Sequence, residues 1–130
     1  MIRTLLTITL LVSAAVGAQI LLTDSDLWEA APSHAYGLIG FVVLDLLVAA
    51  LTLARPRLGS LSAMAWALVK FFIMLGDILT ARSVGFEDYA QFMNYLFSLW
   101  NFDTLLILQL LVALVAYGAF RTTKQTKTTD

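Results

Sequence analysis

The fold follows from two apolar stretches, AYGLIGFVVLDLLVAALTL at residues 35–53 and LSAMAWALVKFFIMLGDIL at residues 61–79. Each is close to the roughly 20 residues that a helix needs to cross a bilayer. Asp45 stands near the middle of the first stretch and Lys70 near the middle of the second. If the stretches are consecutive antiparallel spans, acid and base lie at the same depth, where a charge costs about 2.5–3.5 kcal/mol even on the lenient insertion scale. Each charge therefore needs a partner, a water-filled cavity or a function.

The composition of the whole chain is that of a membrane protein. Of its 130 residues, 60% are hydrophobic and only 13% are charged, whereas soluble domains contain about 45–50% apolar and about 25% charged residues. The absence of cysteine excludes disulfides, thiolate metal sites and iron–sulfur clusters. The single histidine, His34, excludes a haem held by two histidines of one chain. We predict no catalytic activity, no resident cofactor and no nucleic-acid partner.

Two further apolar runs flank this pair, at residues 5–22 and 104–120. Backbone in hydrocarbon must satisfy its own hydrogen bonds, so each of the four runs is predicted to be a transmembrane helix. The connections at residues 23–34 and 54–60 are short, which makes sequence neighbours antiparallel neighbours in space. The sequence therefore predicts an all-α integral membrane protein, with one antiparallel four-helix bundle over residues 1–120.

The loop charges predict an orientation, because Lys and Arg favour cytoplasmic loops. One side of the four-span path carries Arg3, Arg55, Arg57, Arg121, Lys124 and Lys127. The other side carries Asp24, Asp26, Glu29, Glu87, Asp88 and Asp103, with Arg82 as its one basic residue. We expect a protein of the cell membrane with both termini cytoplasmic. The basic, Thr-rich residues 121–130 are predicted to form a disordered tail over the anionic inner headgroups.

The first span has a competing interpretation as a secretory signal. Arg3, the apolar run and the small residues Val16, Gly17 and Ala18 are also typical of a cleaved signal peptide. Cleavage would leave three spans and an outside N-terminus. We expect the segment to be retained as the first span.

Residues 84–100 are amphipathic, and we predict a helix lying in the outer interface between the third and fourth spans. Its polar residues recur at helical spacing among aromatic residues that suit the headgroup boundary. The expected interface anchors are Trp28, Phe92, Tyr95 and Trp100. One interpretation makes this helix an anchor that positions the fourth span, and the other makes it a lid or docking surface.

Asp45, Lys70 and Asp77 are the candidate intramembrane site. Asp77 follows Lys70 by two helical turns, so the two share one face of the third span. One interpretation is a proton or cation path from the bilayer centre to the outer rim, since intramembrane ionisable groups are functional candidates by default. A second is a buried pair that fixes which helices meet. A third is that the charges contact another subunit.

The outer rim offers a second candidate site. Glu29, His34, Asp77 and Asp103 all lie near outer helix ends, and one imidazole with carboxylates is a plausible ligand set for a divalent cation. Within the spans, Gln109 is expected to form a hydrogen bond between helices. Close helix contact is expected at the small residues Ser13, Ala14, Gly17, Ala18, Ala35, Gly37 and Gly40.

These patterns favour a non-catalytic accessory or structural subunit of a larger membrane complex, with a respiratory or oxidoreductive complex as the expected setting. Its partners would be the lipid bilayer and either other membrane subunits or further copies of itself. The alternative is a small homo-oligomeric transporter or channel, coupled to protons or cations through Asp45 and Lys70. A third hypothesis is a membrane metal-binding protein that uses the outer acidic rim.

Overall fold

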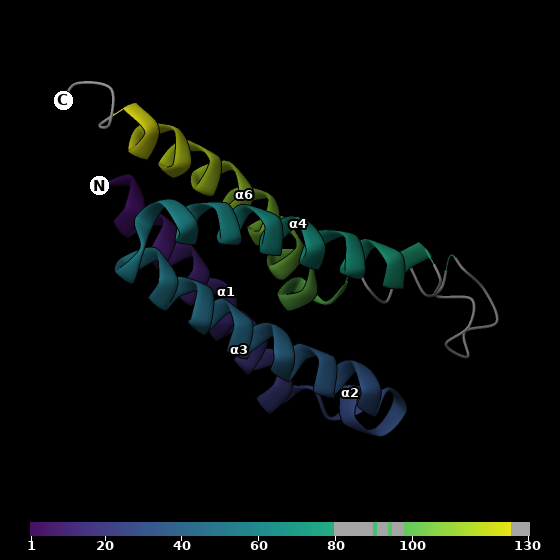
Figure 1. The fold of residues 1–130 in the computed structure, drawn as a ribbon. Helices are drawn as coiled ribbons and strands as arrows, with labels where there is room; N and C mark the ends of the chain where they lie inside the picture. The colour runs from purple at the N-terminus through teal and green to yellow at the C-terminus, as the bar shows by residue number, and fades with distance from the viewer. Residues whose placement is uncertain (80–89, 91–93, 95–97, 126–130) are drawn as a thin grey trace.

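The computed structural model describes residues 1–79, 90, 94 and 98–125, apart from the side chains of Ala30, Lys124 and Gln125, and the elements in it are helices. Along the chain these are α1 (Ile2–Thr23), α2 (Ser25–Ala30), α3 (Pro32–Ala54), α4 (Pro56–Leu79) and α6 (Trp100–Gln125), as Figure 1 shows. All except α2 are long and apolar enough to cross a membrane. The predicted all-helical class and its four membrane-length helices are therefore confirmed, and each helix extends beyond its predicted apolar run.

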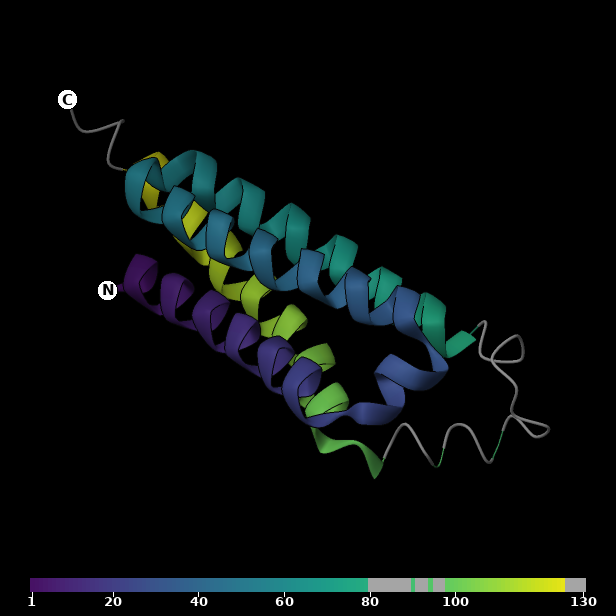
Figure 2. The same cartoon turned by 90° about the horizontal axis from the view of Figure 1, so that it is seen from below.

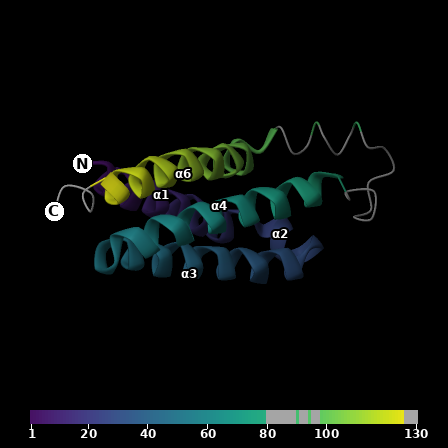
Figure 3. The ribbon, with the colours of Figure 1, turned by 45° about the horizontal axis from the view of Figure 1, so that its top comes forward.

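The four long helices contact one another in a closed order. α1 packs against α3 and α6, and α4 packs against the same two helices, whereas α1 and α4 barely touch. The α3–α4 turn, the N-terminus and the last described turn of α6 lie at one end, which we call the termini end (Figures 2 and 3). The core is built from leucine and valine on two helices and alanines on three, so the helices approach closely: Leu6, Leu10, Ala49, Ala63, Ala67, Val112, Ala116 and Ala119.

The turn between α3 and α4 is much shorter than the predicted connection at residues 54–60, because Arg55 alone separates the two helices. Proline suits the first position of a helix, since its missing N–H has no partner there anyway, and α4 begins at Pro56. Gly59 is buried against α3, where an added Cβ would lie 2.5 Å from the backbone nitrogen of Thr52. The absence of a side chain at Gly59 lets α4 start directly against α3.

The predicted loop at residues 23–34 contains the short helix α2. Asp24 caps this helix, its Oδ1 accepting a hydrogen bond of 3.0 Å from the backbone N–H of Leu27. The indole of Trp28 donates to the carbonyl oxygen of Leu21 over 2.8 Å and packs edge-on against Tyr36. These contacts fold the connection back onto the ends of α1 and α3. Asp24 is an ordinary capping residue, which the sequence could have indicated.

The C-terminal helix also departs from the prediction. α6 continues to Gln125, through the first half of the segment expected to be a disordered tail. Thr122 and Thr123 support this extension, because their hydroxyls donate to carbonyl oxygens one turn earlier, at Ala119 and Phe120. Residues 126–130 lie outside the described residues.

The predicted interfacial helix at 84–100 falls mostly outside the described residues, including the anchors Phe92 and Tyr95. Ala90, Asn94 and Ser98 are described as helical. Trp100 is the first residue of α6 and is 61% exposed.

The predicted small-residue contacts divide into two groups. A Cβ added to Gly17 would lie 2.9 Å from Val42 Cγ2, so this glycine brings α1 close to α3. Gly37 and Gly40 have no atom within 4 Å of an added Cβ, so they face open space. Correspondingly, only 17% of the apolar window of α3 is buried inside the chain, against 44% for α1.

Candidate functional site

The centre of the molecule holds a buried ion pair. Lys70 Nζ on α4 lies 2.7 Å from Asp45 Oδ2 on α3, and the two side chains are 1% and 2% exposed. Both residues stand near the middle of their helices. The predicted Asp45–Lys70 pair is therefore confirmed, and the two charges meet within one chain rather than on a partner subunit.

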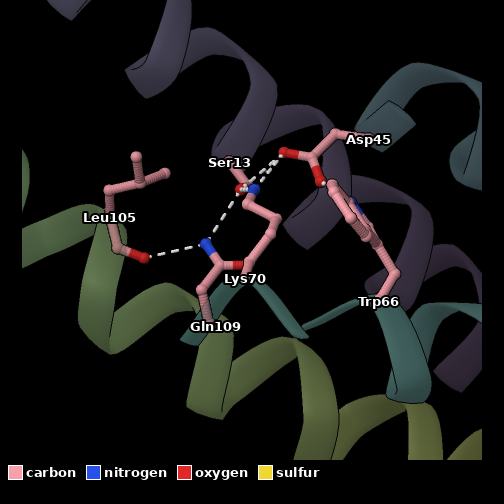
Figure 4. Close-up of polar contacts among 6 residues, drawn as sticks. All are labelled: Ser13, Asp45, Trp66, Lys70, Leu105 and Gln109. Atoms are coloured by element: carbon pink, nitrogen blue, oxygen red, sulfur yellow. Dashed lines mark hydrogen bonds and ion pairs between the residues drawn. The ribbon is translucent and has the colours of Figure 1, made fainter. Parts of the chain in front are cut away.

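The carboxylate of Asp45 accepts three hydrogen bonds (Figure 4). Oδ2 accepts from Lys70 Nζ over 2.7 Å and from the hydroxyl of Ser13 over 2.8 Å. Oδ1 accepts from the indole Nε1 of Trp66 over 2.8 Å. The donors come from α1 and α4, so both oxygens of a buried carboxylate are satisfied by neighbouring helices.

Ser13 connects the ion pair to the fourth long helix. Its Oγ donates to Asp45 and accepts from Lys70 Nζ over 3.0 Å and from Gln109 Nε2 over 3.1 Å. A serine hydroxyl has one donor and two acceptor sites, so these three contacts use its full capacity. Gln109 Nε2 also donates to the carbonyl oxygen of Leu105 over 2.8 Å, which uses both of its N–H groups.

Aromatic rings cover the ammonium group. Lys70 Nζ lies 5.5 Å from the ring centroid of Phe41 and 5.9 Å from that of Trp66, within the range of cation–π attraction. The two rings pack edge to face with 5.5 Å between their centroids. Trp66 thus serves both charges, since its N–H bonds Asp45 and its ring faces Lys70.

We call Ser13, Asp45, Trp66, Lys70 and Gln109 the polar cluster. It takes at least one residue from each of the four long helices (Figure 4). Gln109 bonds across helices, as its position in the fourth span predicts. Sequence reasoning missed the roles of Ser13 and Trp66, because it treats Ser13 only as a small packing residue and assigns no role to Trp66.

A second polar contact joins α1 to α3 nearer the termini end. The buried hydroxyls of Thr7 and Thr52 lie 2.8 Å apart. Each also lies within hydrogen-bond distance of a carbonyl oxygen of its own helix, Arg3 O and Ala49 O respectively. Threonine often bonds its own helix backbone in this way, so the sequence alone did not indicate a contact between helices.

At the outer rim, two of the four predicted residues lie in contact. His34 Nε2 lies 3.5 Å from Asp77 Oδ1, and the two side chains are 45% and 43% exposed. Glu29 and Asp103 do not complete a site with them, since no group of three or more His, Asp or Glu able to hold a metal occurs in the described part of the chain. Asp77 pairs with His34 at the end opposite the termini and does not extend the polar cluster.

Ser13, Asp45, Lys70 and Gln109 are buried and are bonded to one another. Two surface hollows of about 450 and 440 Å³ both lie at the termini end, and neither is lined by a residue of the cluster. An ion that bound directly at Asp45 would have to displace one of the hydrogen bonds that its carboxylate now accepts. The arrangement is suited to holding four helices in one register.

No protein-family model, curated protein or solved structure matches this chain. The residues of the cluster and the surfaces around it therefore carry the functional argument.

Proposed function

We propose that this protein is a non-catalytic structural subunit of a larger membrane complex. The observation that supports this most is the bonding of the buried polar cluster, in which side chains and the carbonyl oxygen of Leu105 satisfy Asp45, Ser13 and the amide N–H groups of Gln109. A transported ion would need access to these groups, whereas a scaffold needs them to stay paired. The cluster then acts as a fixed joint between the spans.

The proposal includes a membrane arrangement. The four long helices would form an antiparallel bundle across the bilayer, with both termini on the cytoplasmic side. Charge supports this orientation: Arg3, Arg57 and Arg121 lie in the helix turns at the termini end, and Arg55 forms the α3–α4 turn there. Acidic residues stand toward the opposite end, namely Asp24, Asp26, Glu29, Asp77 and Asp103.

We also propose that α1 is retained as a span rather than removed as a signal segment. Ser13 supports this, because it bonds Asp45, Lys70 and Gln109 at once. Loss of α1 would leave a lysine, a carboxylate and an amide with fewer partners at the depth where unsatisfied polar groups cost most.

The surface of α3 supports association with other helices. α3 exposes large apolar residues, including Tyr36, Val43 and Leu47, and its open glycines Gly37 and Gly40 would let another helix approach closely. A lipid-facing helix needs no glycines on its surface.

The test is native purification in mild detergent through a tag on the C-terminus, followed by native mass measurement. We expect a stoichiometric complex with other membrane proteins. Gly40→Leu should reduce recovery of that complex, whereas Leu114→Ala, at a residue of α6 that is 70% exposed, should leave it intact. Recovery of the chain as a monomer or small homo-oligomer would contradict the subunit proposal.

A second candidate, a proton- or cation-coupled transporter, is favoured by one observation, the acid–base pair itself at mid-helix depth. Reconstitution in liposomes separates the two proposals. A transporter would show ion flux that Asp45→Asn abolishes while the protein still assembles. A structural subunit would show no flux in the wild-type protein.

A further inference from the structure

One hollow at the termini end combines cationic and apolar walls. It has a volume of about 450 Å³ and is lined by Arg55, Pro56, Arg57, Leu58, Leu61 and Phe120. These residues come from the α3–α4 turn, the first turns of α4 and the last turns of α6. The hollow therefore lies at the termini end, where these three segments meet.

The two arginines have no acidic partner among the residues that the structure describes. The acid–base contacts found there are Asp45–Lys70 and His34–Asp77, both on other parts of α3 and α4. Arg55 and Arg57 are exposed, and the guanidinium carbon of Arg57 lies 5.8 Å from the ring centroid of Phe120. This contact holds one cation at the rim of the hollow, next to an apolar floor.

The apolar floor continues away from the arginines along α4. Leu58 and Leu61 are 46% and 45% exposed, and Leu68 and Phe72 are exposed further along the helix. The spacings of three, seven and four residues place all of them on one face. An exposed apolar track thus runs from the cationic rim toward the middle of the helix.

We propose that this hollow binds one anionic phospholipid. Its phosphate would lie between Arg55 and Arg57, since guanidinium groups match phosphate oxygens in a bidentate geometry. One acyl chain would lie on Leu58 and Leu61 and follow the exposed face of α4. The charge of the rim selects an anionic headgroup, and the apolar track selects a lipid over a soluble phosphate. The inference rests on the membrane placement proposed above and is independent of the subunit role.

The test uses the full-length protein in micelles that contain equal amounts of phosphatidylglycerol and phosphatidylcholine, followed by native mass spectrometry. We expect one retained phosphatidylglycerol per chain, with a preference of roughly thirtyfold, as two headgroup-level cations imply. The double variant R55Q/R57Q should lose this preference, and R55K/R57K should keep most of it. The matched control R3Q/R121Q removes the same charge from the same end and should change the preference by less than about twofold.

Two further measurements test whether the acyl chain is needed for binding and whether the arginine variant is still folded. Glycerol phosphate added in excess should not displace the lipid, because it has no acyl chain to occupy the track. The circular dichroism of R55Q/R57Q should match that of the wild type, because both arginines are exposed. Equal retention of the two lipids by the wild type, or an equal loss in R3Q/R121Q, would overturn the proposal. Because micelles impose no orientation, lipid preference can persist even if the proposed topology or subunit role fails.

Discussion

Two acid–base pairs join α3 to α4, and they differ in almost every physical respect. Asp45 and Lys70 lie 2.7 Å apart and are at most 2% exposed. His34 and Asp77 lie 3.5 Å apart with more than two fifths of each side chain exposed. The first pair lies beside Ser13, Trp66 and Gln109, whereas the second is exposed at the surface near the helix ends. The comparison separates a buried pair bonded to its neighbours from an exposed pair near the ends of the same two helices.

We call Asp45–Lys70 the inner pair and His34–Asp77 the outer pair. Because the inner pair is buried, losing one of its partners is costly. Removing one partner of a buried pair leaves an uncompensated charge and costs about 3–5 kcal/mol in soluble proteins. For an exposed pair, water replaces the lost partner, and measured values are about 0–1 kcal/mol. The inner pair should therefore hold the helices together, and the outer pair should contribute little.

The largest expected effect is that of Asp45→Asn. The amide oxygen still accepts from Trp66 or Ser13, but Lys70 loses its counter-charge, so the free energy of unfolding should fall by about 3–5 kcal/mol. Unfolding by denaturing detergent, followed by Trp fluorescence, measures the change. A loss below about 1 kcal/mol would place the inner pair in the same energetic class as the outer one.

Ser13→Ala should have an intermediate effect. It removes a donor to Asp45 and an acceptor for Lys70 and Gln109, so a loss of about 1–2 kcal/mol is expected. The matched control is Ser60→Ala. Ser60 is as buried as Ser13, but within the described part of the chain its hydroxyl bonds its own helix, at the carbonyl oxygen of Pro56. If both variants lose the same stability, the contacts of Ser13 across helices add nothing to the inner pair.

Asp77→Asn should have the smallest effect. It makes the same chemical change as Asp45→Asn at the other pair, where both partners are exposed, so stability should change by less than about 0.5 kcal/mol. The same denaturing-detergent titration compares the two directly. A loss approaching that of Asp45→Asn would mean that the outer pair is shielded from water in the membrane.

The sequence predicted the four long helices and the inner pair for two reasons. The length of the apolar runs indicates the helices, and the short connection places Asp45 and Lys70 near the middle of neighbouring antiparallel helices. It did not predict that Ser13 would bond three partners at once, because a serine in a span is equally typical of simple close packing. Nor did it predict the indole–carboxylate bond of Trp66, which depends on how α4 is rotated about its axis.

The helix ends were predicted less well than the helix centres. The predicted apolar run ends before the polar segment that starts at Arg121, whereas α6 continues through it because Thr122 and Thr123 bond their own helix. Similarly, Gly59 and Pro56 reduce the predicted turn at residues 54–60 to Arg55 alone. Local hydrogen bonds and close approach decide these ends, and hydropathy does not report either.

The most direct test of the polar cluster as a fixed joint is a double-mutant cycle with Asp45→Asn, Lys70→Met and the two changes combined. The cycle measures the free energy of unfolding in mild detergent for all four proteins. We expect each single change to cost about 3–5 kcal/mol and the combined change to cost less than either, because no buried charge is then left alone. Additive losses would contradict the account, since they would show that Asp45 and Lys70 stabilise the protein independently.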